Sequence, residues 1–161
     1  MRKEFIAIAT MAFLFAISCR KQDAGEGTLN LQSPSGLRIA ASVDDLKKDA
    51  AAAITRKYGS PRDINITAIR YLPVGKGYAA IVDYRLADGT AGNYAVLYRT
   101  NYKIASEEDV YSANRQVHMV CASTGECDCY VTNVKIDDEA GTVSFSCSCG
   151  ACIPVIIVTE N

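Results

Sequence analysis

Three features of the sequence predict an α+β fold. Residues 43–58 carry apolar side chains at helical spacing, and three strand-like runs follow at 64–72, 78–86 and 93–99. The last part of the chain, 116–161, contains six cysteines among further strand-like runs. An amphipathic helix buries its apolar stripe well against one face of a sheet. The sequence therefore predicts one amphipathic helix packed on an antiparallel β-meander, followed by a cysteine-rich β module.

The helix has a clear start signal and a clear stop signal. Ser42 is a preferred N-cap residue, and Asp45 follows it at the spacing of a capping box. Gly59 and Pro61 end the helical pattern. The apolar stripe consists of Val43, Leu46, Ala50, Ala53, Ile54 and Tyr58. Basic side chains lie mostly off the stripe, on what we expect to be a solvated face: Lys47, Lys48, Arg56 and Lys57.

The strand-like runs are rich in β-branched and aromatic residues, which are typical of strands. In 64–72 the alternation changes phase near Ala68, which predicts a β-bulge. Tyrosines in the second and third runs can either line a binding surface or pack across the strands, and we expect packing. These tyrosines are Tyr78, Tyr84, Tyr94 and Tyr98.

The N-terminus has the composition of an export signal. Arg2 and Lys3 form a basic start, and residues 5–17 are apolar except for Thr10. A membrane-spanning helix needs about 20 apolar residues, so this stretch is too short for one. We therefore expect residues 1–18 to be a signal peptide that is removed.

The apolar stretch ends in Ala16, Ile17, Ser18 and Cys19, which resembles the lipobox of bacterial lipoproteins. The resemblance covers only this leader. It implies cleavage before Cys19, acylation of that cysteine with lipid chains such as palmitate, and anchoring in the cell envelope. Arg20 is not the aspartate that this family associates with inner-membrane retention, so the outer membrane is the expected location, facing either the periplasm or the surface. The membrane is then one partner of the protein.

The mature chain is expected to have a lipidated cysteine and a flexible tether at 19–36, followed by one domain at 37–161. Residues 20–36 are polar and rich in Gly, Ser and Pro. Without residues 1–18 the chain has 15 basic and 17 acidic residues, a net charge of about −2. A slightly acidic chain without a basic block lacks the positively charged surface that is typical of nucleic-acid-binding proteins.

The cysteines follow the spacing C-x5-C-x-C-x17-C-x-C-x2-C and are Cys121, Cys127, Cys129, Cys147, Cys149 and Cys152. They lie in or beside the strand-like runs 116–121, 128–136, 142–149 and 153–159. A loop of three or five residues between the middle two runs places all four C-x-C sulfurs on one face, with Cys129 opposite Cys147 in one register. A loop of two or four residues places the two pairs on opposite faces. The convergence of two C-x-C motifs favours the shared face.

Three interpretations of these six cysteines compete. Three disulfides fit an even cysteine count in an exported chain, although six cysteines allow 15 pairings. A four-thiolate zinc site, with His118 as an outside candidate, fits soft sulfur donors, but the doubled C-x2-C pattern is absent. A redox-active pair would use Cys149 and Cys152, but no helix follows them to lower a thiol pKa. We expect disulfides and no cofactor, with zinc or thiol redox chemistry as the alternative.

The sequence carries no recognisable reaction centre. His118 is its only histidine, and strand alternation places it opposite Val117 and Met119, at an expected surface or partly buried position. Motifs for a nucleophile elbow, a zinc peptidase or a phosphate loop are absent. We therefore expect a non-enzymatic, lipid-anchored envelope protein that binds a protein or small molecule or has a structural role.

Overall fold

The computed structural model describes residues 29–98, 103–104, 115–125 and 127–160. The elements in chain order are α1 (Val43–Tyr58), β1 (Ile64–Val74), β2 (Gly77–Leu86), β3 (Ala91–Tyr98), β4 (Lys103–Ile104), β5 (Arg115–Ala122), β6 (Val131–Asp137), β7 (Thr142–Cys147) and β8 (Ile153–Glu160). The predicted helix bounds are confirmed. The predicted signal peptide and Cys19 lie outside the described residues.

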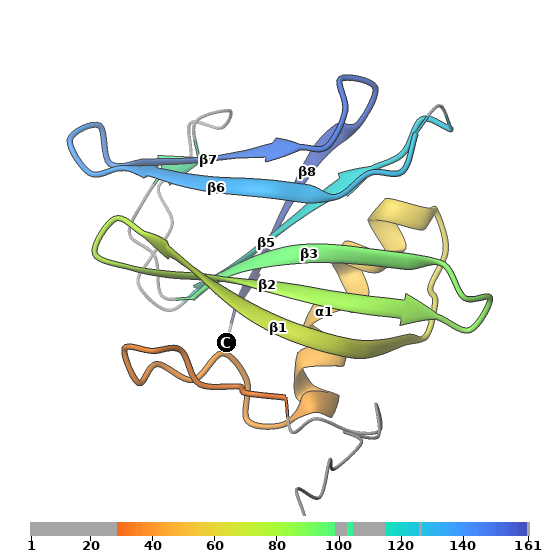
Figure 1. Cartoon of the computed structure of the whole chain (residues 1–161), viewed down its shortest axis with the longest axis horizontal. Coiled ribbons are helices and arrows are strands. Elements are labelled where there is room, and N and C mark those ends of the chain that lie inside the picture. The colour runs from red at the N-terminus through yellow and green to blue at the C-terminus, as the bar shows by residue number, and fades with distance from the viewer. Residues whose placement is uncertain (1–28, 99–102, 105–114, 126, 161) are drawn as a thin grey trace, which may run out of the picture.

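The strands form two sheets. The larger sheet is antiparallel and has the order β1-β2-β3-β5-β8. The smaller has the order β4-β7-β6, with β6 and β7 antiparallel and the short β4 parallel to β7. Helix α1 covers one face of the larger sheet, and the β6–β7 hairpin lies over the other (Figure 1). The α+β class is thus confirmed, with the cysteine-rich part divided between the two sheets.

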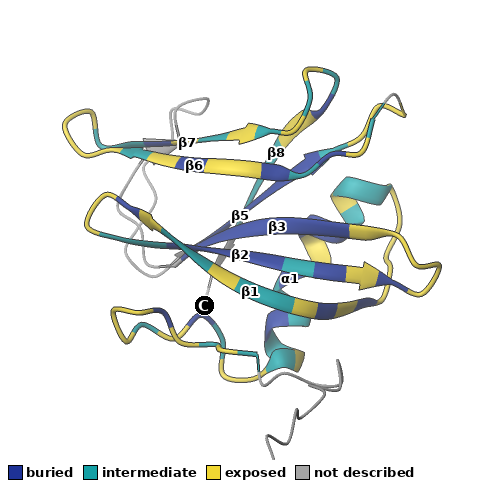
Figure 2. Cartoon of the chain, in the orientation of Figure 1, coloured by how far each residue is buried: buried dark blue, intermediate teal, exposed yellow. Residues whose placement is uncertain are grey.

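Both faces of the larger sheet are buried, which a helix on one face alone would not achieve. Along β2, Ala80 and Val82 pack toward α1, whereas Ala79 and Ile81 pack toward β6 and β7. The central strands β2, β3 and β5 are accordingly buried over most of their length (Figure 2). Two separate hydrophobic cores result, one on each side of the sheet.

The predicted bulge and the predicted tyrosine packing are both present. The register of β1 against β2 shifts between Ile66 and Ala68. Tyr84 and Tyr94 are buried under α1, with ring centroids 6.2 Å apart. Tyr78 is half-buried, and the side chain of Tyr98 lies outside the description. Packing therefore accounts for the two buried tyrosines.

Part of the predicted tether belongs to the domain. Residues 29–36 fold back on the chain, with a bridge between Gln32 and Arg38. Leu29 and Leu31 pack against the core under α1. The prediction of a flexible tether was wrong for residues 29–36. It rested on the Gly, Ser and Pro content of this stretch, which does not reveal that Leu29 and Leu31 pack against the core.

The capping of α1 provides a first test of the fold. Ser42 Oγ accepts a hydrogen bond from the backbone amide of Asp45 at 3.1 Å, as the capping box predicted. Replacing Ser42 with alanine is expected to lower the free energy of unfolding by about 1 kcal/mol, because an amide at the helix start loses its partner. Urea denaturation measures the change. Ser60→Ala, at an exposed position just beyond the helix, should change stability by less than about 0.5 kcal/mol, and an equal effect of both changes would contradict the capping role.

Candidate functional site: the disulfide cluster

The β6–β7 hairpin brings the two C-x-C motifs together in an unexpected way. Four residues, 138–141, connect the strands, and the regular register pairs Val134 with Phe145. A loop of this length alone would separate the motifs on opposite faces. A bulge between Val131 and Asn133 shifts the register by one residue, so Cys147 pairs with Val131 in place of Thr132. The predicted pairing of Cys129 with Cys147 across the strands is absent.

Cys127 and Cys129 also precede β6 instead of lying within it, and Cys149 follows β7. The strand rule on which the prediction rested therefore does not govern these residues. Their sulfurs nevertheless converge, because the chain segments before β6 and after β7 run together. The hydroxyl of Ser148 donates to the carbonyl of Asp128 at 2.8 Å and accepts from the amide of Tyr130 at 3.0 Å.

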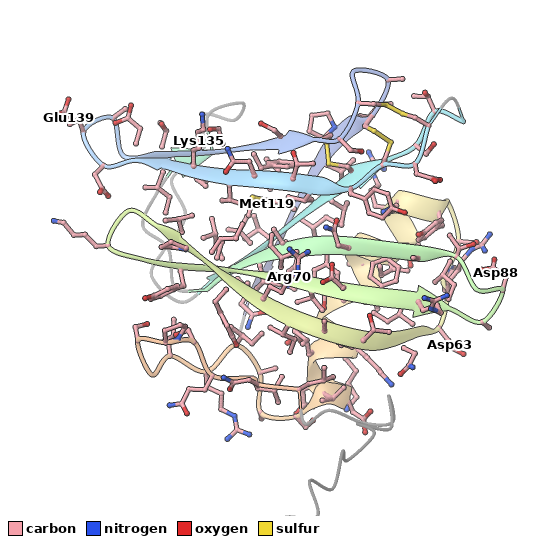
Figure 3. The ribbon with its side chains drawn as sticks, in the orientation of Figure 1. Asp63, Arg70, Asp88, Met119, Lys135 and Glu139 are labelled. Atoms are coloured by element: carbon pink, nitrogen blue, oxygen red, sulfur yellow. A yellow bond between two sulfur atoms is a disulfide. The ribbon has the colours of Figure 1, made fainter. Side chains whose placement is uncertain are left out.

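All six cysteines form disulfides, in the pairs Cys121–Cys147, Cys127–Cys149 and Cys129–Cys152. The three bonds lie close together at one end of the hairpin (Figure 3). The disulfide interpretation is thus the one that the structure shows, with the pairing that sequence alone left open.

The Cys121–Cys147 bond has a different role from the other two. Cys121 is fully buried in β5 of the larger sheet, whereas Cys147 ends β7 of the smaller sheet. This bond is therefore a covalent link between the two layers.

The remaining four sulfurs form a compact group. The Sγ atoms of Cys127, Cys129, Cys149 and Cys152 all lie within 4.8 Å of one another. Non-bonded contacts join Cys152 Sγ to Cys149 Sγ at 3.4 Å and to Cys127 Sγ at 3.7 Å. Cys129 and Cys152 are buried, whereas Cys127 and Cys149 are half-buried. His118 is not part of this group.

Lys57 lies beside the cluster, although the sequence placed it on a solvated helix face. Its Nζ donates a hydrogen bond to the carbonyl oxygen of Cys129 at 2.9 Å. The same Nζ lies 5.6, 5.7 and 5.8 Å from the ring centroids of Tyr58, Tyr84 and Tyr130, within cation–π range. Burial lowers the pKa of Lys57 to about 8, against a smaller upward effect of Asp128. The predicted solvated position is wrong for Lys57, because its stem follows apolar rings at the end of α1.

His118 is likewise not where the sequence placed it. It is fully buried under α1, at 0% exposure, with its ring 5.9 Å from that of Tyr94. Neither ring nitrogen has a hydrogen-bond partner among the described residues. Burial lowers the pKa of His118 to about 4. The expected surface or partly buried position was wrong, because strand alternation gives the face of a residue but not what covers that face.

A buried amide joins the larger sheet to the start of β6, close to the cluster. Asn93 on β3 donates from Nδ2 to the carbonyl of Val131 at 3.0 Å and accepts from the amide of Val131 at 2.8 Å. These bonds satisfy both backbone groups of Val131 in a buried place. The cluster is thus attached to the domain by a disulfide, a lysine and an asparagine.

A shallow groove of about 480 Å³ lies between α1 and β8, the last strand of the larger sheet. Ala52, Arg56 and residues 153–157 line it, and Ile153 is 54% exposed. These aliphatic walls with one guanidinium suit contact with another molecule. No group of the kind that transfers protons is among the residues that line the groove.

Comparison with protein-family models, with curated proteins and with solved structures finds no match. Among the described residues, no helix is long and apolar enough to cross a membrane.

Proposed function

We propose that this chain is a lipid-anchored protein of the cell envelope that works without catalysis, as a binding or structural module. The observation that supports this most is the oxidised state of the six cysteines after Cys19. Disulfides form and persist in oxidising compartments outside the cytoplasm. This agrees with the expected export signal and with the lipobox-like sequence that ends at Cys19.

The anchor would hold the domain close to the lipid surface. Leu29 is the first described residue and packs against the domain, so the free tether comprises at most residues 20–28. A chain of this length spans at most about 30 Å when fully extended. Two or three acyl chains on Cys19 would make the attachment stable, since each buried methylene contributes about 0.8 kcal/mol.

The surroundings of His118 support a role without catalysis. A general base must reach the proton that it removes and must bind a proton near the working pH. His118 is enclosed under α1, and its lowered pKa of about 4 keeps it neutral. The open groove between α1 and β8 is instead suited to holding a partner.

Mass spectrometry of the protein purified from membranes tests this proposal. The expected product begins at Cys19, carries a diacylglycerol and fractionates with the outer membrane. Cys19→Ala should abolish acylation and remove the protein from that fraction, whereas Gln22→Ala, a change in the tether, should affect neither. An intact leader, or an unacylated mature N-terminus in the wild-type protein, would show that the anchoring proposal is wrong.

A further inference from the structure

The four-sulfur group has nearly the dimensions of a tetrahedral metal site. A zinc ion bound by four thiolates at about 2.3 Å keeps the sulfurs about 3.8 Å apart. Here two of the non-bonded contacts, at 3.4 and 3.7 Å, are already close to that spacing, and no pair exceeds 4.8 Å. Only the two bonded pairs would have to separate, each by about 1.7 Å given an ordinary disulfide length.

We propose that Cys127, Cys129, Cys149 and Cys152 form a zinc site when their two disulfides are reduced. The oxidised and the zinc-bound forms would be two states of one cluster. Four soft thiolate donors in tetrahedral reach favour zinc over magnesium or calcium, which take oxygen ligands. This inference concerns the cluster alone and does not depend on the lipid anchor.

The surrounding structure would keep the four cysteines together after reduction. The Cys121–Cys147 bond joins the two sheets independently of the group, and Cys121 is fully buried. The hydrogen bonds of Asn93 to Val131 fix the start of β6. Lys57 places a cationic side chain beside Cys129, which partly offsets the double negative charge of a zinc ion with four thiolates.

The different burial of the two bonds sets an order for their reduction. The half-buried Cys127–Cys149 bond is the more accessible of the two, and a dithiol reductant would attack it first. A thiolate of the reductant forms a mixed disulfide with one cysteine and displaces the other as a thiolate. The second thiol of the reductant then closes its own disulfide and releases the first cysteine. Two electrons and two protons pass to the protein in this step.

The buried bond can then be reached from inside the cluster. Cys149 Sγ lies 3.4 Å from Cys152 Sγ, so the Cys149 thiolate can attack there, form a Cys149–Cys152 bond and displace Cys129 as a thiolate. A second dithiol reduces this new bond. In total two dithiols become two disulfides and the protein gains four thiols. Zinc then replaces the four thiol protons, which pass to solvent.

Differential alkylation of the wild-type protein tests the site directly. The full mature chain is reduced without oxygen by a phosphine, given Zn²⁺ and freed of excess metal by gel filtration. We expect about one zinc per chain and a retained β-sheet circular dichroism spectrum. Mass mapping should show Cys127, Cys129, Cys149 and Cys152 shielded from alkylation until a chelator removes the zinc. Co²⁺ in place of zinc should give the visible absorption of a tetrahedral four-sulfur site.

Cysteine variants identify the ligands independently. Cys149→Ser should lower zinc affinity at least 10-fold and change the Co²⁺ spectrum, whereas the control change Ser146→Ala, at an exposed position of the same hairpin, should leave both as in the wild type. The proposal is overturned if the reduced wild-type chain unfolds, retains no zinc, or shows shielding of a different set of cysteines. These wild-type measurements decide the question even if a variant does not fold.

Discussion

Removal of the Cys121–Cys147 disulfide by a double change to alanine is expected to lower the free energy of unfolding by about 2–5 kcal/mol. The two cysteines are 26 residues apart, and without the bond the unfolded chain regains part of its freedom. The other two disulfides shorten the loop that this bond closes, which keeps the entropic contribution within the typical 2–4 kcal/mol. Loss of the buried Cys121 side chain adds to the effect, because its core contacts disappear.

Denaturation in urea under non-reducing conditions measures this loss. The matched control is the double change Cys127→Ala and Cys149→Ala, which removes a half-buried bond beside the remaining Cys129–Cys152 bond. We expect a smaller destabilisation there, because the neighbouring bond still holds the same two chain segments. A Cys121–Cys147 effect below about 1 kcal/mol, or smaller than the effect of the control, would refute its role as the link between the layers.

The parts of the fold that depend on local chemistry were predictable. Helix α1 begins and ends where Ser42 and Gly59 predicted, because capping acts within a few residues. The bulge at Ala68 appeared in the sequence as a change of alternation, since side chains of a strand must keep to their faces. These features need no knowledge of distant contacts.

The parts that depend on what covers a surface were not predictable. Alternation correctly placed His118 on the face opposite Met119, but it gave no sign that α1 would bury the histidine completely. For the same reason the sequence places Lys57 among the solvated basic residues of the helix. Its three aromatic neighbours come from α1, β2 and the segment before β6, which only the folded chain brings together.

The cluster combines a predictable element with an unpredictable one. Six cysteines in a chain expected to be exported predicted three bonds, and the structure has them. The disulfide partners depend on the segments before β6 and after β7, where Cys127, Cys129 and Cys149 lie, and on a bulge between Val131 and Asn133 that changes the register of the hairpin by one residue. No turn residue at 138–141 encodes that bulge, so sequence rules for hairpin loops could not give the partners.

The burial of His118 leads to the second large expected effect, a loss of stability in acid. In the folded chain the pKa of His118 is about 4, whereas its ordinary value is 6.5. Between these two pH values the unfolded chain binds a proton that the folded chain does not, so stability falls as the pH decreases from 6.5 to 4. The full loss amounts to about 3 kcal/mol, of which roughly three-quarters has occurred at pH 4.5. Well below pH 4, where both states bind the proton, this histidine contributes no further change.

Replacing His118 with leucine should remove this acid sensitivity, and urea denaturation at pH 7 and pH 4.5 measures it. Carboxyl groups with a lowered pKa, such as Asp45 and Asp88, are common to both proteins and cancel in the comparison.

At pH 7 the His118→Leu variant should be as stable as the wild type or more so, because it removes two buried nitrogens that have no partner in the described structure. Val96→Ala, on the paired position of the neighbouring strand, should instead lower stability equally at both pH values. An unchanged pH dependence in His118→Leu would show that other groups cause the acid loss, whereas a flattened one would establish that α1 keeps an uncharged histidine in the core.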